Sequence, residues 1–242
     1  MNDRASACLV FEDRPSDSLF VERVWRSRSE RAGRFLSIAQ NNFEMAVTRH
    51  QGRTFLTLRG PETKATMADC PADGEWLGIR FTLGTFMPKH MPEDLSDRRD
   101  VNLPVATGHS FWLDGSAWDY PAFENAETFV KRLVAKGLIS REPAVDAVLQ
   151  GHQHAMSLRS VQRRFLRATG LSRSEVHQVE RARHATNLLR QGAPILDAVF
   201  DAGYFDQPHL TRSLKHWIGL TPSEVVSGHE QLSFLYKTMP RS

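Results

Sequence analysis

Residues 157–222 contain one sequence pattern twice, and the second copy lies 49 residues after the first. Each copy has a polar residue that can cap a helix, an amphipathic segment that carries an arginine, a glycine, and a second capping residue. The corresponding residues are Ser157 and Asp206, Val161 and Leu210, Arg163 and Arg212, Phe165 and Leu214, Gly170 and Gly219, Leu171 and Leu220, and Ser172 and Thr221. Three of these pairs are identical and the others keep their physical character, so the pattern predicts two related helical units.

A short apolar segment that begins with a proline precedes each copy. These segments, residues 143–149 and 194–202, are predicted helices, because the first helical turn accepts proline. Their apolar faces are expected to comprise Val145, Val148 and Leu149 in the first segment, and Leu196, Val199 and Phe200 in the second. The order of helix, turn and helix therefore occurs twice, and this architecture lays its second helix in the DNA major groove.

Positive charge is concentrated in the same part of the chain. The net charge is only +3, but residues 1–140 hold 18 basic and 19 acidic side chains, whereas residues 141–222 hold 11 basic and 7 acidic ones. Ten of those 11 basic residues are arginine, which bonds well to phosphate and to the guanine edge. A solvated basic face is the alternative interpretation, but the positions of the arginines on the predicted helices favour a nucleic-acid partner.

The chain has the composition of a soluble globular protein of one or two domains, with 40% hydrophobic and 24% charged residues. Residues 1–17 do not resemble a secretory signal, and no apolar run approaches the ~18 residues that a membrane helix needs. Cys8 and Cys70 do not form a disulfide framework, so reduced thiols in the cytoplasm are expected, with a redox pair as the alternative. No membrane partner is expected.

The first half of the chain has a β-rich pattern. Short runs of β-branched and aromatic residues at 18–27, 43–48, 54–59 and 76–83 are separated by turn signals. This spacing favours a sandwich or a barrel, and the polar residues 87–100 are predicted to form a loop.

Two sets of side chains in this half could bind a ligand. A barrel lined by tryptophans can hold a small apolar ligand, although plain core packing explains the same residues; they are Trp25, Trp76, Trp112 and Trp118. Three histidines could in principle converge on a metal, but their spacing is not that of a ligand set; they are His50, His90 and His109. No metal site, catalytic residue or cofactor is therefore predicted.

A helix is predicted over residues 125–137. Asn125 is its expected cap and Gly137 its end, and its apolar stripe consists of Phe129, Val130, Leu133 and Val134. The stripe either packs on the barrel or pairs with a second copy in a dimer. The composition changes soon afterwards, which predicts three segments: a β-rich sensor domain over residues 1–138, a tandem helix-turn-helix domain over 139–228, and a tail over 229–242.

The helix predicted over residues 157–169 is the first candidate for reading DNA. Its buried stripe is expected at Leu158, Val161 and Phe165, which leaves a polar face near the helix N-terminus. Arginine can bond bidentately to guanine and glutamine to adenine, whereas arginines further along the helix are expected on phosphates. The turn before this helix, about residues 151–156, is longer than the corresponding turn of the second unit and contains His152 and His154.

The capping box that begins at Ser172 starts a long helix that ends near residue 191. At ~1.5 Å per residue its length is about 25 Å, which suits a spacer between two reading helices one duplex turn apart, roughly 34 Å. The second reading helix begins at Asp206, with Pro208 in its first turn. Its inward-facing residues are predicted to be Leu210, Leu214, Trp217 and Ile218.

The sequence thus predicts two classes of DNA contact. The predicted base-reading residues are Arg159, Gln162 and Arg163 in the first unit, and Gln207, Thr211 and Arg212 in the second. The predicted contacts to the DNA backbone are Ser157, Arg164, Arg167, Asp206, His209 and Lys215.

The motifs MSLRSVQRRFLRATGLS (residues 156–172) and GYFDQPHLTRSLKHWIGLTPSEV (residues 203–225) resemble the AraC/XylS family of bacterial transcription regulators. The resemblance covers about residues 142–226, and the family's base-reading positions fall on the same six residues. Arg173 stands where the family usually has proline. The resemblance implies promoter DNA as the partner, often bound by a homodimer, contact with RNA polymerase, and a small effector or protein partner at the N-terminal domain, whose β-rich pattern is similar to cupin-like or related sensor domains.

The predicted fold class is therefore α+β with two domains, and the predicted function is a sequence-specific transcription regulator and not an enzyme. One alternative is a DNA-docked enzyme, or a redox- or metal-dependent sensor, with its chemistry in the β-rich domain. That reading needs a reactive cysteine or a metal-ligand set. Another alternative is a β-rich domain that only dimerises.

Overall fold

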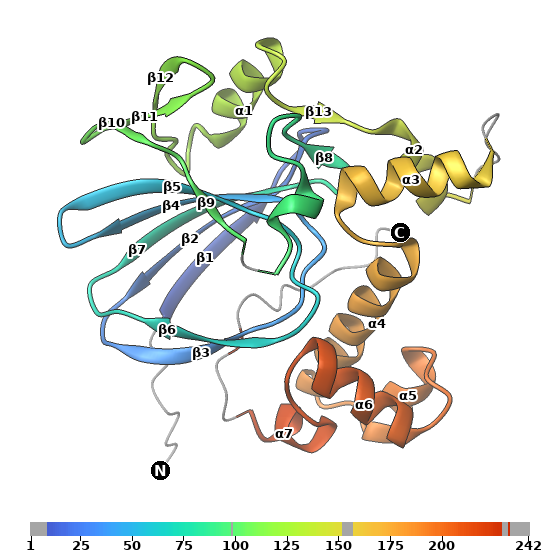
Figure 1. Cartoon of the computed structure of the whole chain (residues 1–242). Coiled ribbons are helices and arrows are strands. Elements are labelled where there is room, and N and C mark those ends of the chain that lie inside the picture. The colour runs from blue at the N-terminus through green and yellow to red at the C-terminus, as the bar shows by residue number, and fades with distance from the viewer. Residues whose placement is uncertain (1–8, 98, 152–156, 229–231, 233–242) are drawn as a thin grey trace.

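The computed structural model describes residues 9–97, 99–151, 157–228 and 232. A β-rich part occupies the first half of the chain, and a helical part packs along one side of it (Figure 1). Within the described residues, none of the helices combines the length and apolar character that crossing a bilayer requires. Cys8, His152 and His154, for which possible roles were considered above, lie outside the described residues.

The β-rich part is built on a six-stranded antiparallel sheet. In spatial order its strands are β1 (Leu9–Pro15), β2 (Val21–Ser29), β7 (Glu75–Phe81), β4 (Glu44–His50), β5 (Arg53–Arg59) and β9 (Val101–Asn102). Four of these strands, β2, β7, β4 and β5, lie on the four segments predicted from sequence, and their ends differ from the predicted ones by at most three residues.

Three smaller sheets complete this part. They pair β3 (Gly33–Ser37) with β6 (Thr66–Cys70), β8 (Thr85–Phe86) with β13 (Ser140–Arg141), and β10 (Val105–Thr107) with β11 (Ser110–Leu113) and β12 (Ser116–Asp119). The prediction of a loop over residues 87–100 is wrong at one point, where η1 (Pro92–Leu95) forms a 3-10 turn. Pro92 starts this turn and Leu95 is buried, so the segment is anchored to the core.

The two faces of the large sheet differ in character because successive side chains of a strand point to opposite faces. One face carries Met45, Val47, Ile79 and Phe81, which belong to the main apolar core. Helix α1 (Ala126–Ala135) covers this face with residues of the predicted stripe, including Phe129, Val130 and Leu133. The stripe therefore packs within the chain.

Asn125 does not cap α1 in the way that the sequence predicts. Its side chain makes no capping bond to the helix. Instead, the Asn125 Oδ1 atom accepts a hydrogen bond from the backbone N–H of Ala122, at 2.8 Å. The asparagine thus stabilises the turn before the helix, which is the usual competing role of this side chain.

The helical part contains α2 (Pro143–Leu149), α3 (Leu158–Thr169), α4 (Arg173–Arg190), α5 (Ile195–Asp201), α6 (Gln207–Trp217) and α7 (Pro222–Ser227). We call α2 with α3 the first unit and α5 with α6 the second unit. Helix α4 runs from one unit to the other (Figure 1) and contacts α5, α6 and α7.

Each unit has an apolar core of its own, and each core includes residues of the β-rich part. The core of the first unit contains Val145 and Phe165, and Leu83 and Phe86 pack against it. The core of the second unit contains Leu36 and Ile38 from β3 and the residues that follow it, together with buried side chains of α4 to α7. The helical part is therefore docked on the β-rich part at two places.

Candidate nucleic-acid interface

Helix α3 begins with a side-chain cap and presents a basic face. The Ser157 Oγ atom accepts a hydrogen bond from the backbone N–H of Ser160, at 3.3 Å, which satisfies one of the free amides of the first turn. Arg159, Gln162 and Arg163 are all exposed, as the helical periodicity predicts. Their side chains are therefore accessible to a ligand along one side of the helix.

The predicted buried stripe of α3 is correct at Val161 and Phe165 but wrong at Leu158. Leu158 is 81% exposed, because it lies in the first turn, beyond the contact with α2. Ala168 is buried and completes the stripe instead of Leu158. An exposed leucine beside the basic face adds apolar surface to this end of the helix.

The two arginines predicted to contact phosphates are exposed as well. Arg167 lies in the last turn of α3. The Arg164 Nη1 atom lies 3.7 Å from the Glu142 Oε1 atom, and the Arg164 side chain is 53% exposed. An exposed ion pair of this kind contributes little free energy, so Arg164 can exchange its carboxylate for another anion.

Helix α4 starts with the predicted capping box. The Ser172 Oγ atom accepts from the Glu175 backbone N–H at 3.2 Å, and the Glu175 carboxylate accepts from the Ser172 backbone N–H at 2.7 Å. The 18 residues of the helix span about 27 Å at 1.5 Å per residue. Leu188 is only half-buried, and the inner face consists of Val176, Val179, Ala182, Ala185, Thr186 and Leu189. The helix provides a continuous connection between the units.

Helix α6 is capped by Asp206, whose carboxylate accepts from the His209 backbone N–H at 2.7 Å. Gln207 and Arg212 are exposed. The Thr211 hydroxyl is half-buried and donates to the Gln207 carbonyl oxygen at 2.9 Å. All four residues predicted to face inward do so: Leu210, Leu214 and Ile218 are fully buried, and Trp217 is half-buried against the same core.

His209 makes a packing contact within the helical part that the sequence did not predict. Its ring packs edge-on against Tyr204, with the ring centroids 5.1 Å apart, and Arg181 of α4 lies over the same tyrosine at 4.2 Å. The Tyr204 hydroxyl lies 2.8 Å from the Ser213 hydroxyl. These contacts fix α6 to α4 and to the turn before it. In the sequence, the feature that could have indicated this contact is Tyr204, which directly follows the turn residue Gly203.

Helix α5 differs from its prediction. Leu196 and Phe200 are 60% and 73% exposed, whereas Ala198 and Val199 are buried. The prediction fails because only one side of this short helix contacts α4 and α6. Leu149 in α2 is likewise exposed, at 46%. Phe205, in the turn before α6, is 88% exposed, so the second unit presents aromatic surface beside its reading helix.

Residues 152–227 match the family model described as "Helix-turn-helix domain". This model is of the AraC type, and the matched segment spans α3 to α7. The chain carries an AraC-type helix-turn-helix domain. Such a domain is typical of DNA-binding transcription regulators. No curated protein and no solved structure matches the chain.

The structure places the predicted backbone-contacting residues in two groups. Arg164, Arg167 and Lys215 are exposed cations. Ser157 and Asp206 occupy N-cap positions, and their side chains are already engaged with the helix amides. Helix N-termini favour anions, so backbone amides at these positions can approach a phosphate even where the side chain does not.

Proposed function

We propose that the chain is a sequence-specific transcription regulator that reads two neighbouring major grooves of one promoter with α3 and α6. The observation that supports this most directly is that both helices have capped N-termini and exposed Arg and Gln side chains and are connected through α4. In this proposal Arg159, Gln162 and Arg163 contact bases from the first unit. Gln207, Thr211 and Arg212 contact bases from the second unit.

The β-rich part is, in this proposal, a sensor domain that modulates DNA binding. Its docking on both units supports a role in setting their relative positions. A cupin-like or related fold is a further part of the proposal, which follows from the β-rich pattern of the N-terminal part. A homodimer and contact with RNA polymerase follow from the resemblance of the helical part to AraC/XylS regulators.

The test is a selection of bound fragments from random duplex DNA at stated ionic strength, followed by titration of the selected site. Arg163→Ala and Arg212→Ala should each weaken binding by about 1–3 kcal/mol and relax the preference at one base position. Arg167→Ala should weaken binding to all sequences alike. Lys131→Ala, an exposed cation on α1, is the control. If Arg163→Ala and Arg212→Ala bind the selected site as the unsubstituted protein does, the base-reading assignment is wrong.

A further inference from the structure

The face of the large sheet that points away from α1 carries buried charges. Glu44 on β4 lies directly opposite Arg59 on β5 and Arg80 on β7 in the strand register. Glu44 and Arg80 are only 2% and 3% exposed. The Trp25 indole N–H donates to the Glu44 carboxylate at 2.9 Å, and the Arg80 Nε atom lies 3.6 Å from it. Burying ionic groups costs desolvation free energy. The buried charges on this face therefore point to a role besides packing.

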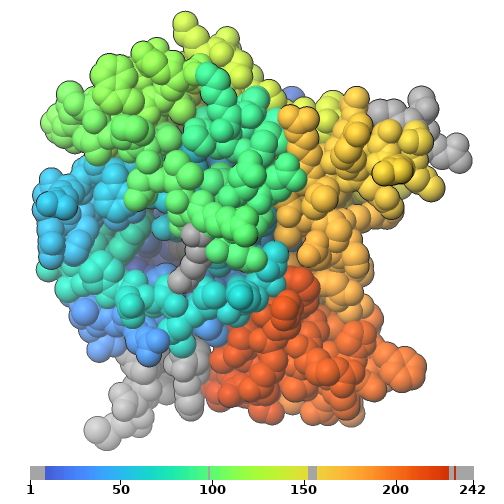
Figure 2. All heavy atoms as spheres, in the orientation of Figure 1, coloured from blue at the N-terminus to red at the C-terminus, as the bar shows by residue number. Residues whose placement is uncertain are grey.

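A cavity of about 370 Å³ separates this face from the two-stranded β3–β6 sheet. Figure 2 shows the β-rich part hollowed on this side of the molecule, between the segments coloured blue and green. The volume falls within the range of small-molecule sites, about 300–1,000 Å³. The sheet therefore has one face filled by apolar side chains and one face with room for a ligand.

The residues that line the cavity define the chemistry of that ligand. Carboxylates from Glu44, Glu62, Asp69 and Asp100 line it, whereas Arg59 is the basic residue among the described lining residues. Phe35 and Trp76 supply aromatic walls of the same cavity. Carboxylates attract a cation by charge, and aromatic faces attract it through the ring quadrupole. Arg59, Arg80 and Arg34 form ion pairs with three of these four carboxylates. Four carboxylates against three arginines leave the lining net negative, so an anion would be repelled.

We propose that this cavity binds a small organic cation, an amine or quaternary ammonium with an apolar body. The inference rests on the proposed regulator function, because it names the chemical class of the effector. It goes further by assigning the site to the space between the large sheet and the two-stranded β3–β6 sheet.

The β3–β6 sheet also connects the cavity to the second unit. Phe35 and Ser37 of β3 line the cavity, whereas Leu36 and Ile38 point the other way, into the core shared with α4 and α6. A strand presents alternate side chains to opposite sides, so one wall serves both the ligand and the helices. A ligand that moves β3 therefore also moves the surface on which the second unit rests.

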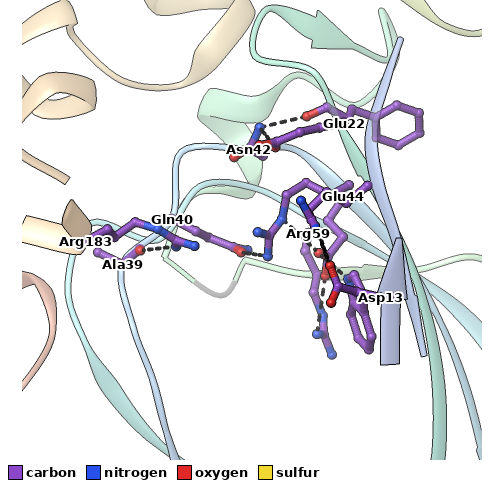
Figure 3. Close-up of polar contacts among 12 residues, drawn as sticks. Asp13, Glu22, Ala39, Gln40, Asn42, Glu44, Arg59 and Arg183 are labelled. Atoms are coloured by element: carbon purple, nitrogen blue, oxygen red, sulfur yellow. Dashed lines mark hydrogen bonds and ion pairs between the residues drawn. The ribbon is translucent and has the colours of Figure 1, made fainter. Parts of the chain in front are cut away.

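Backbone contacts extend this connection. The Ala39 backbone N–H donates to the Trp217 carbonyl at 2.8 Å, and Arg183 of α4 donates to the Ala39 carbonyl at 3.1 Å. The neighbouring Gln40 lines the cavity and accepts a hydrogen bond from Arg80 at 3.2 Å. Figure 3 shows this line of contacts from Arg183 through Ala39 and Gln40 towards Glu44 and Arg59. Linkage requires that DNA changes the affinity for the cation by the same factor as the cation changes the affinity for DNA.

The experiment uses the full chain without DNA and follows tryptophan fluorescence and the thermal unfolding midpoint. The probes are three amines, butylamine, phenethylamine and tryptamine, each paired with the carboxylate of matching body, namely valerate, 3-phenylpropionate and indole-3-propionate. At least one amine should bind saturably, raise the midpoint, and bind more tightly than its carboxylate partner. If no amine is preferred over its partner, the cation site is wrong.

A matched pair of variants locates the site. The double variant Glu62→Gln, Asp100→Asn should weaken amine binding by about tenfold, since two charge-assisted contacts are lost. Its unfolding midpoint without ligand is measured alongside, because the Asp100–Arg59 and Glu62–Ser37 contacts are changed as well. Glu93→Gln, at an exposed position on η1, should leave amine binding unchanged. Equal amine affinity in the double variant and the control would overturn the assignment of the cavity.

A final measurement separates this proposal from the proposed regulator function. Saturating amine should change the affinity for the selected DNA several-fold in the unsubstituted protein and not in the double variant. Unchanged DNA affinity with bound amine would overturn the connection through β3. If amines bind but no DNA sequence is selected, the regulator function fails and the cation site stands. If DNA is selected but no amine binds, the opposite holds.

Discussion

The two units share a sequence pattern, but their reading helices lie in different surroundings. Helix α3 has four exposed arginines and a small core, closed by α2 and by Leu83 and Phe86. On helix α6 the exposed cations are Arg212 and Lys215. This helix packs in a larger core that includes α4, α7 and part of β3. The first unit is therefore suited to electrostatic attachment, and the second to a fixed orientation on the duplex.

The turns before the two helices show the same contrast. In the second unit Tyr204 and Arg181 hold α6 to α4, and exposed aromatic residues flank the reading face. In the first unit Leu158 is exposed, and the cap at Ser157 is the side-chain contact that begins α3. We expect phosphate contacts to dominate the DNA affinity of the first unit. For the second unit, we expect the fixed packing of α6 to matter more.

The largest effect is expected from emptying the core of the second unit. Leu214→Ala should lower the free energy of unfolding of the helical part by about 2–5 kcal/mol, because Leu214 is fully buried. Urea unfolding followed by circular dichroism measures this change. Leu166→Ala on α3, where the side chain is 44% exposed, is the control and should cost much less. Equal losses would contradict the difference in packing.

The second comparison uses the corresponding glycines Gly170 and Gly219, which have φ of 73° and 85°. A Cβ atom at Gly170 would lie 2.9 Å from the Pro92 carbonyl group, which is backbone, whereas one at Gly219 would lie 2.9 Å from the end of the Leu36 side chain. A side-chain end moves more easily than backbone, so Gly170→Ala should destabilise the protein more than Gly219→Ala does.

Gly203→Ala provides the baseline for this series. Its φ is 70° and no described atom beyond its neighbours lies within 4 Å of the added Cβ, so it reports the left-handed backbone alone, about 1–2 kcal/mol. Gly170→Ala should exceed this baseline by about 1–3 kcal/mol. Chemical unfolding of the three variants in parallel gives the order, and a Gly170→Ala value at the baseline would show that the first unit is not held against η1.

A smaller effect is expected in the salt dependence of DNA binding. Each phosphate contact contributes about 0.9 to the slope of log affinity against log salt. Replacing Arg164 and Arg167 together by alanine should lower the magnitude of that slope by about 1.8, and Lys215→Ala by about 0.9. Titrations at three or more salt concentrations measure the slopes. If the second unit changes the slope more than the first, the division of roles proposed here is reversed.

The smallest effect concerns the capping box that begins α7. The Thr221 backbone N–H and hydroxyl donate to the Glu224 carboxylate, at 2.6 and 2.7 Å, and hold the pKa of Glu224 below its ordinary value. Because the folded-state pKa is lowered, the stabilisation is present above the ordinary pKa of a glutamate and is lost as the pH falls through the folded value. Carboxyl NMR titration of Glu224 should give a midpoint below 4.5. Thr221→Ala should return that midpoint towards the ordinary value.

The sequence predicts the helical part well because its signals are local. Caps such as Ser172, the stopping glycines and the 3.6-residue periodicity determine each helix without reference to distant residues. The predictions that fail, at Leu158, Leu196, Phe200 and Asn125, concern which side of an element meets a neighbour, and this depends on tertiary contacts. In the β-rich part four strands are predicted and the other described strands are missed. Among these, β3 and β6 have five residues each and little alternation of apolar and polar side chains.

The candidate DNA contacts are predicted by the same local rules, and the structure adds their surroundings. Nothing in the sequence indicates that Arg181 lies over Tyr204, since 23 residues of chain separate them. The cavity could not be predicted for a related reason. Glu44, Arg59 and Arg80 become neighbours only through strand pairing, and a carboxylate with two arginines at those spacings is not a recognisable motif.

The alternation along β3 has a consequence for protein engineering. Phe35 and Leu36 face opposite compartments, so deleting one residue ahead of them would exchange the two and turn the leucine towards the cavity. We expect such a deletion to disable the second unit, although no residue of this segment is among the predicted DNA contacts. A chimera that joins the helical part to a different N-terminal domain should therefore retain residues 33–39 of this chain.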